Sequence, residues 1–175
     1  MSAFRAGKEC ERLMTRAINA IKTNATRLLE SAGIPFETRE YEVDESDLSG
    51  AHIAAQLNLP PEQIFKTLVL KGEKNGFFVC CLPVSDELDL KKTAKAFGDK
   101  KCDLIPMKDL KELTGYIRGG CSPVGMKKKF PTIFDETVVL FDKIYLSAGI
   151  RGVQMVVDPR DLLPFVDAKT ADIVK

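Results

Sequence analysis

The clearest structural signal of the chain lies in residues 64–82, which read IFKTLVLKGEKNGFFVCCL. This stretch contains two apolar runs, and their length and composition predict strands at Thr67–Leu70 and Phe77–Leu82. Between the runs stands Asn75-Gly76, the dipeptide most typical of a β-hairpin turn. The stretch therefore predicts two antiparallel strands joined by a short turn.

Weaker signals on both sides of this hairpin predict further helices and strands. Helices are expected at residues 25–32 between Thr23-Asn24 and Gly33, around Ile53 to Leu57 after Ser49, at Leu88–Phe97, at Lys108–Leu113 and from Pro159. Strands are expected at Phe36–Val43, Lys101–Ile105, Thr132–Phe134, Lys143–Leu146 and Gln154–Val157. Because hairpins alternate irregularly with helices, the order favours an α+β fold or a mixed sheet over a doubly wound parallel sheet.

Length and composition fit one globular domain. The chain has 175 residues, of which 45% are hydrophobic and 29% charged, which is ordinary for a folded protein of this size. Residues 1–20 read as an N-terminal extension, so the domain is expected at residues 21–175. The net charge is +1, and attraction to a polyanion must therefore come from a local patch.

The five cysteines never show a C-x-x-C spacing, which disfavours a disulfide framework and a thiolate zinc site. No apolar run approaches the ~20 residues that a membrane helix needs, and the N-terminus lacks the apolar stretch of a secretory signal. The sequence predicts a cytoplasmic protein that needs no membrane, no metal and no other cofactor.

Lys66 is the first candidate site residue, because a cation at the start of an apolar strand is unusual. In a cleft, such a lysine can hold a phosphate or polarise an ester carbonyl. The alternative is a lysine whose ammonium extends from the strand end into water.

A glycine-rich loop, GGCSPVG at residues 119–125, is the second candidate. Gly119 and Gly120 allow close backbone approach and can present N–H groups to an anion, although the segment can also be a plain connection. A serine or cysteine nucleophile is disfavoured, since the spacing from Ser122 to Gly125 is one residue too long for a nucleophile elbow. The only histidine, His52, lies far away in sequence.

Three consecutive lysines, Lys127–Lys129, follow this loop, and others stand at residues 91–101. In a chain of nearly zero net charge, such a cluster suggests contacts with a phosphate backbone. A solvated surface is the alternative.

Many short segments, taken in order, resemble the YbaK/EbsC-type aminoacyl-tRNA deacylases, which act on mischarged tRNA(Pro). The resemblance covers residues 22 to 175. It rests on Phe65-Lys66-Thr67-Leu68, Leu88-Asp89-Leu90-Lys91-Lys92, Thr114-Gly115-Tyr116, Gly119-Gly120, Ser122-Pro123, Gly125, Lys127-Lys128, Pro131-Thr132-Ile133, Ile144-Tyr145, Ser147, Asp167-Ala168-Lys169 and Ala171-Asp172-Ile173.

The resemblance implies a mixed, mostly antiparallel, barrel-like sheet with surrounding helices and a cleft for the aminoacylated CCA end of tRNA. It implies that Lys66, Gly119 and Gly120 act in catalysis. Substrate binding is implied for Tyr41, Thr67, Ser122, Pro123, Ser147, Lys127 and Lys128. The expected partner is aminoacyl-tRNA(Pro), with prolyl-tRNA synthetase as a candidate protein partner.

For the cysteine-specific branch of the family, the resemblance implies a substrate-assisted mechanism. The thiol of the misattached cysteine attacks its own ester and leaves as a thiolactone, so the enzyme supplies positioning and electrostatic stabilisation. Two alternatives stay open: hydrolysis of Ala-tRNA(Pro) by water, and a non-catalytic module that binds tRNA or a synthetase. The sequence departs from the family at Cys121 and Ala148, at Gln154, which replaces an acidic residue, and in the shorter segment 42–52.

Overall fold

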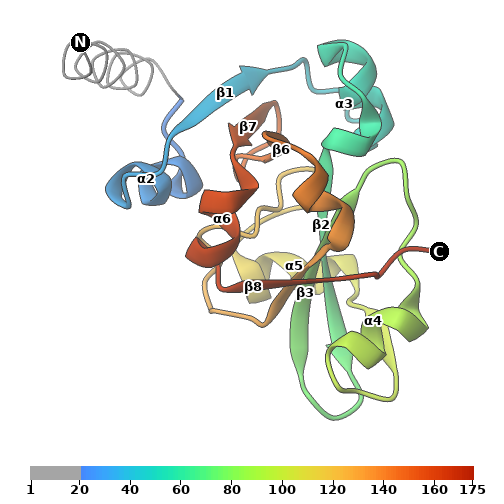
Figure 1. Ribbon diagram of the computed structural model, residues 1–175. Coiled ribbons are helices and arrows are strands. Elements are labelled where there is room, and N and C mark those ends of the chain that lie inside the picture. Colours follow the sequence, from blue (N-terminus) through green and yellow to red (C-terminus); the bar gives the residue numbers. More distant parts are fainter. Residues whose placement is uncertain (1–20) are drawn as a thin grey trace.

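The computed structural model describes residues 21–175, in which five α-helices and eight β-strands follow one another (Figure 1). The helices are α2 (Asn24–Ser31), α3 (Gly50–Leu57), α4 (Leu90–Ala96), α5 (Met107–Thr114) and α6 (Pro159–Phe165), with short 3-10 helices η1 (Pro61–Gln63) and η2 (Glu136–Leu140). The strands are β1 (Phe36–Glu40), β2 (Phe65–Gly72), β3 (Phe77–Pro83), β4 (Cys102–Leu104), β5 (Thr132–Asp135), β6 (Ile144–Ser147), β7 (Val153–Val157) and β8 (Ala168–Ala171). The expected extension, residues 1–20, lies outside this described part.

The strands form two sheets, which confirms the predicted α+β class. One sheet has three strands in the order β1-β7-β6, and the other has five in the order β4-β2-β3-β5-β8. The pairs β3–β5 and β5–β8 are parallel, and the remaining pairs are antiparallel. The sheets meet at an isolated parallel bridge between Ile64 and Tyr145. They are therefore linked but open, and do not close into one barrel.

The predicted hairpin is present as β2 and β3, which pair from Phe65 with Pro83 to Lys71 with Phe77. Its turn is longer than a two-residue Asn-Gly turn, because Gly72 N donates to Gly76 O at 2.7 Å. Gly76 has a φ of +75°, the left-handed conformation that glycine adopts at no steric cost.

The buried Asp99 carboxylate explains the longer turn. Its Oδ2 accepts hydrogen bonds from Lys74 N at 3.0 Å and Asn75 N at 2.9 Å. These bonds lower the pKa of Asp99. The turn thus bends around the carboxylate of Asp99, which follows α4 in the chain.

The helix ends follow the capping residues read from the sequence. Thr23 caps α2 through a reciprocal pair with Thr26, in which Thr26 N donates to Thr23 Oγ1 at 3.1 Å and Thr23 N donates to Thr26 Oγ1 at 2.8 Å. Ser49 Oγ accepts from His52 N at the start of α3, and Asp89 caps α4. Such caps satisfy N–H groups that lack an intrahelical partner.

Two strands differ from the sequence-based expectation. β1 ends at Glu40 instead of Val43, because the last residue with which it pairs, Val153, is the first residue of β7. β8 was not predicted. Its sequence, AKTA, has no apolar alternation, and it is held by parallel pairing with β5 at the sheet edge.

Two hydrophobic cores occupy opposite faces of the five-stranded sheet. Phe65, Val69 and Cys81 belong to the main core, which also takes side chains from β6, β7, α2 and α6. Leu70 and Leu82 belong to a second core with α4. Figure 1 shows α4 beside the turn end of the β2–β3 hairpin and α3 near the end where β2 begins. Because side chains alternate along a strand, Lys66 lies on the face of Leu70, opposite the main core.

Within residues 21–175, no helix is both long and apolar enough to cross a membrane.

Candidate functional site

Lys66 is a half-buried cation at the beginning of β2. Its Nζ donates a hydrogen bond to Asp86 O at 2.7 Å. Burial lowers the pKa of Lys66, and the carboxylates of Asp86 and Glu87 act in the opposite direction. An ammonium group has three N–H donors, so the bond to Asp86 leaves donors for an anion or a carbonyl oxygen.

Lys66 stands where the two sheets meet. A parallel bridge joins Ile64 to Tyr145, and Lys66 and Ser147 each lie two residues further along the chain, on β2 and β6. Ser147 in turn pairs with Gln154 of β7. Alternation puts these three side chains on the face opposite the main core. We call Lys66, Ser147 and Gln154 the sheet junction.

The glycine loop packs against the turn between β6 and β7. A Cβ atom added at Gly120 would lie 3.2 Å from both Arg151 N and the carbonyl carbon of Ile150. Gly119 has a φ of +82°, and Arg151 Nε donates to Arg118 O at 2.8 Å. Close backbone approach therefore favours glycine at position 120, and the left-handed backbone conformation favours it at position 119.

The hydrogen bonds of the loop restrict which of its N–H groups can receive a ligand. Gly120 N donates to Ile117 O at 3.0 Å. A ligand oxygen at this loop would therefore bind the N–H groups next to that of Gly120 rather than the N–H of Gly120 itself.

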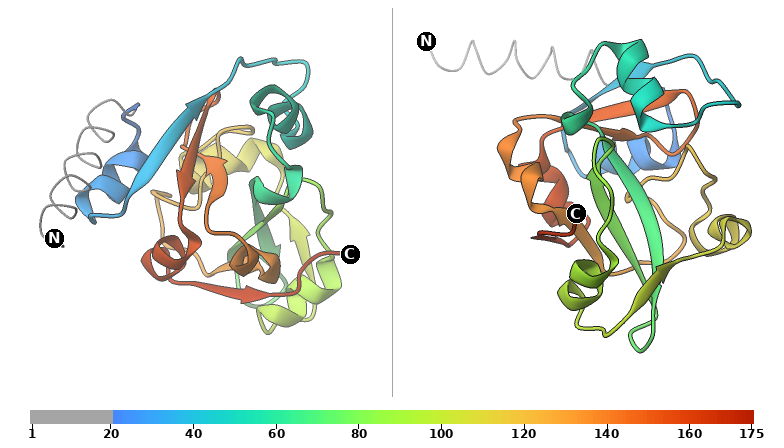
Figure 2. Two further views of the ribbon diagram at one scale, coloured as in Figure 1. Left: turned by 45° about the horizontal axis from the view of Figure 1, so that its top comes forward. Right: turned by 90° about the vertical axis from the view of Figure 1, so that its right-hand side faces the viewer.

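The segment at the start of α3 connects the glycine loop to the segment that holds Asp86, the partner of Lys66. A Cβ at Gly119 would lie 3.5 Å from Leu48 Cδ2, and a Cβ at Gly50 would meet the side chain of Val84. Val84 is two residues from Asp86, which accepts from Lys66. The contacts therefore form a ring around the sheet junction, and Figure 2 shows α3 and the strand end it covers from two sides.

Tyr41 also lies near this ring. Its N donates to Gly152 O at 2.9 Å, which ties the segment after β1 to the β6–β7 turn. The structure thus brings Tyr41, Lys66, the two glycines and Ser147 to one region of the surface. Their expected parts in binding and catalysis stay predictions.

Other expected site residues lie elsewhere. Thr67 faces the main core, and its Oγ1 is 3.6 Å from Cys81 Sγ. Ser122 is fully buried, and its Oγ accepts from Val124 N at 3.2 Å. Pro123 and Lys128 line a small cavity of about 250 Å³ that also contacts Phe165. Ser122 shapes the loop, and contact of all four residues with substrate stays a prediction.

The three consecutive lysines are exposed on the segment between the glycine loop and β5. Lys127 Nζ lies 3.5 Å from Glu112 O, and Lys129 Nζ lies 3.6 Å from Asp167 Oδ2. Both Lys129 and Asp167 are largely exposed, so this pair restrains Lys129 little. The segment is available to a polyanion.

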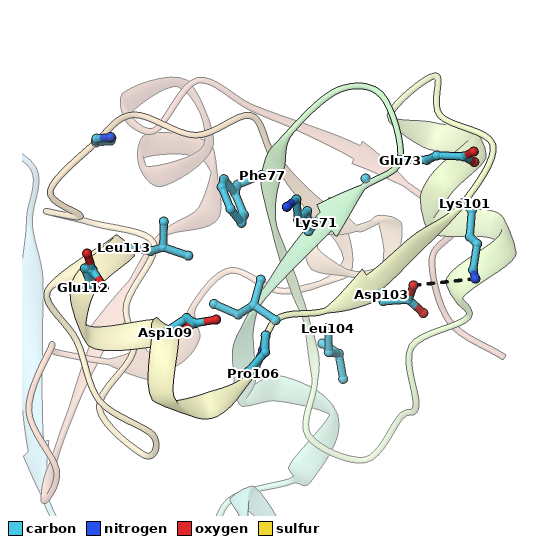
Figure 3. A pocket seen from close by; sticks show the side chains of 13 residues that line it. Lys71, Glu73, Phe77, Lys101, Asp103, Leu104, Pro106, Asp109, Glu112 and Leu113 are labelled. Atoms are coloured by element: carbon cyan, nitrogen blue, oxygen red, sulfur yellow. Dashed lines mark ion pairs between the residues drawn. The ribbon is translucent and has the colours of Figure 1, made fainter.

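A larger cavity, of about 900 Å³, lies at the β4 edge of the five-stranded sheet (Figure 3). Lys71, Phe77 and Lys101 line it together with the carboxylates of Asp103 and Asp109. It includes neither Lys66 nor the two glycines, and its charges are mixed. Size alone does not make it the functional site.

The ring contains residues that sequence reasoning missed, namely Leu48, Asp86 and Arg151. Each depends on a contact between segments far apart in the chain. The sequence signal that could have found one of them was the acidic pair Asp86-Glu87, which follows the second strand after a short connection. The structure's described residues contain no cluster of three or more His, Cys, Asp or Glu side chains that could hold a metal ion.

Comparisons with known proteins identify the family and agree with the fold. The family profile described as "Aminoacyl-tRNA editing domain" matches residues 48–165. A protein of Enterococcus faecalis named "Putative Cys-tRNA(Pro)/Cys-tRNA(Cys) deacylase EbsC" is 45% identical over 152 residues, 87% of this chain and 93% of that protein. A segment of the proline–tRNA ligase of Thermosipho africanus is 33% identical over 76 residues, 43% of this chain and 13% of the ligase.

Among solved structures, one described as "a putative trans-editing enzyme for prolyl tRNA synthetase" superposes with a TM-score of 0.76 and 26% identity. The match covers 89% of this chain and 99% of that structure.

Proposed function

The chain belongs to the aminoacyl-tRNA editing domain family, and on that premise we propose that it is a trans-editing deacylase that removes cysteine from Cys-tRNA(Pro). The observation that carries this proposal is the 45% identity to the Enterococcus protein named as a putative Cys-tRNA(Pro)/Cys-tRNA(Cys) deacylase, in a match that covers 93% of that protein. The presence of both Lys66 and Gly119-Gly120 supports catalysis over simple tRNA binding, because binding alone would not need this ring of contacts.

The proposed reaction uses the thiol of the substrate as its nucleophile. The sulfur forms a bond to the carbonyl carbon of its own ester, and the bond from that carbon to the ribose oxygen breaks. The thiol proton ends on the ribose oxygen, and the products are cysteine thiolactone and tRNA. Lys66 and the glycine loop would stabilise the negative charge that develops on the carbonyl oxygen.

Residues 21–175 form the editing unit in this proposal, and the protein acts in the cytoplasm. Its partner is aminoacyl-tRNA, bound with the CCA end at the sheet junction. Prolyl-tRNA synthetase is a proposed second partner, supported by the similarity of a ligase segment to this chain.

A panel of charged tRNAs tests the proposed activity. We expect purified protein to release cysteine from Cys-tRNA(Pro) at least about 100-fold faster than buffer does, because positioning and charge stabilisation both act on the ester. Ala-tRNA(Pro) and Pro-tRNA(Pro) should stay charged under the same conditions. Preferential release of alanine would favour the water-dependent alternative, and release of neither amino acid would contradict deacylase activity.

Binding of tRNA is expected to weaken steeply with salt, since Lys127, Lys128 and Lys129 would neutralise phosphates. Roughly three neutralised phosphates give a slope of about −2 to −3 when log affinity is plotted against log salt concentration. Changing all three lysines to alanine should flatten this slope, measured by filter binding.

A matched triple variant provides the control for that measurement. Lys91, Lys95 and Lys100 are also exposed but lie on and after α4, away from the glycine loop. Their replacement by alanine should leave the slope near its original value. Equal slopes in the wild type and the 127–129 variant would assign those lysines to a solvated surface.

A further inference from the structure

Gln154 carries a buried carbonyl oxygen that lacks a partner. The residue is only 4% exposed, and its Oε1 is the one buried side-chain oxygen or nitrogen in the described part of the chain without a hydrogen bond. Gln154 sits on β7, the middle strand of its sheet, between Arg39 of β1 and Ser147 of β6. An acceptor left unpaired inside a protein lowers stability.

Packing alone does not explain a glutamine at this position. The neighbouring residues Val153 and Met155 face the main core, whereas Gln154 and Val156 face the other side of the sheet. Leucine, which has a similar size and no polar atoms, would fill the same space without an unsatisfied oxygen. The oxygen is therefore suited to a donor that the free protein does not contain.

The sheet junction defines what kind of donor fits. Lys66 shares this face and is itself a donor, already bonded to Asp86 O. An aminoacyl ester brings a second ammonium group, the α-amino group, whose positive charge is repelled by Lys66. A neutral acceptor beside Ser147 can bind that group without drawing Lys66 away from the ester.

We propose that the side-chain carbonyl of Gln154 accepts a hydrogen bond from the α-amino group of the aminoacyl ester, which makes Gln154 a specificity-determining residue. The assignment rests on the proposed deacylase function. Gln154 fixes the amino group on one side, so that the thiol and the ester carbonyl are directed toward Lys66.

The test compares Cys-tRNA(Pro) with 3-mercaptopropionyl-tRNA(Pro), which has the same thiol and ester but no α-amino group. Because the α-ammonium group also activates the ester, the reference is the ratio of the two uncatalysed rates. We expect the wild type to prefer the cysteinyl substrate in kcat/KM about 10- to 100-fold beyond that ratio, as for a hydrogen bond to a charged group. In Gln154→Leu this extra preference should disappear, because the rate on Cys-tRNA(Pro) falls while the rate on the analogue is unchanged. Gln154→Glu, which keeps an acceptor, should retain the preference.

Val156→Ala is the matched control, since Val156 lies on the same strand and face. It should change kcat/KM for both substrates by the same factor and so keep their ratio. If Gln154→Leu keeps the wild-type ratio, or if its rates on both substrates fall by the same factor, the role assigned to Gln154 is overturned but the proposed function is not. If Gln154→Leu does not fold, Gln154→Met serves with the same expected loss of preference. A wild type inactive on both substrates would overturn the proposed function and the assignment with it.

Discussion

Replacing Lys66 by alanine is expected to lower the rate of Cys-tRNA(Pro) deacylation by about 10²- to 10³-fold, or about 3–4 kcal/mol in the barrier. The physical reason is the loss of a partly desolvated cation whose ammonium group is held by Asp86 O at 2.7 Å. Such a preorganised charge stabilises a developing oxyanion more than water can. Single-turnover assays with purified variants measure the effect.

Stability should not follow activity in this variant. Burial lowers the pKa of Lys66, so the folded chain binds this proton less tightly than the unfolded chain does. At neutral pH, below the unfolded value, the charged lysine therefore costs stability. Lys66→Met, which keeps the apolar stem, is expected to melt at or above the wild-type temperature and still be inactive.

Lys71→Ala is the matched control for Lys66, because Lys71 is an exposed cation on the same strand. It should keep the wild-type rate. Full activity in both Lys66 variants would remove Lys66 from the site, whereas equal losses in the Lys71 variant would point to general effects of charge on tRNA binding.

Serine in place of the substrate's cysteine is expected to slow release from tRNA(Pro) by more than about 100-fold. A thiol of pKa about 8.5 is partly ionised near neutral pH and is strongly nucleophilic, but a hydroxyl is neither. Ser-tRNA(Pro) and Cys-tRNA(Pro) carry the same ester and differ only in this atom. Comparable rates for the two substrates would contradict the substrate-thiol mechanism.

The protein's own thiols are poor candidates for the nucleophile. In the described residues, Cys80, Cys81, Cys102 and Cys121 are all buried and free, and Cys10 lies outside that part. Burial raises the pKa of each of these four thiols, that of Cys121 to about 12. They are therefore almost entirely protonated at neutral pH.

Changing these four cysteines one at a time to serine should leave most of the deacylation rate, provided that each variant folds. Melting temperature measured on the same samples separates a folding defect from a catalytic one. A folded Cys121→Ser protein as inactive as Lys66→Ala would restore a protein nucleophile.

Local signals predicted most of the elements, because they depend on residues close together in sequence. The caps at Thr23 and Ser49 stand where they were expected. β8 escaped prediction because parallel pairing with β5 holds it, and no short pattern records a partner strand 36 residues away.

In the candidate site, too, features that depend on nearby residues were predicted and features that depend on distant contacts were not. Lys66 and Gly119-Gly120 were singled out by their residue types, and resemblance to a family gave them their expected catalytic roles, since neither motif is specific alone. Asp86 and Leu48, and the orphaned oxygen of Gln154, were not predicted. Their surroundings depend on the register at which two sheets meet, which periodicity within one segment does not contain.

The pairing of β1 with β7 has a consequence for synthesis of the protein. Phe36 pairs with Val157, and such distant contacts form slowly because a long stretch of chain must be ordered first. While β7 is still inside the ribosome, Lys66 and the glycine loop have already been synthesised, but the sheet that brings them together has not yet formed. Proofreading by this protein therefore begins only after β7 has left the ribosome and paired with β1.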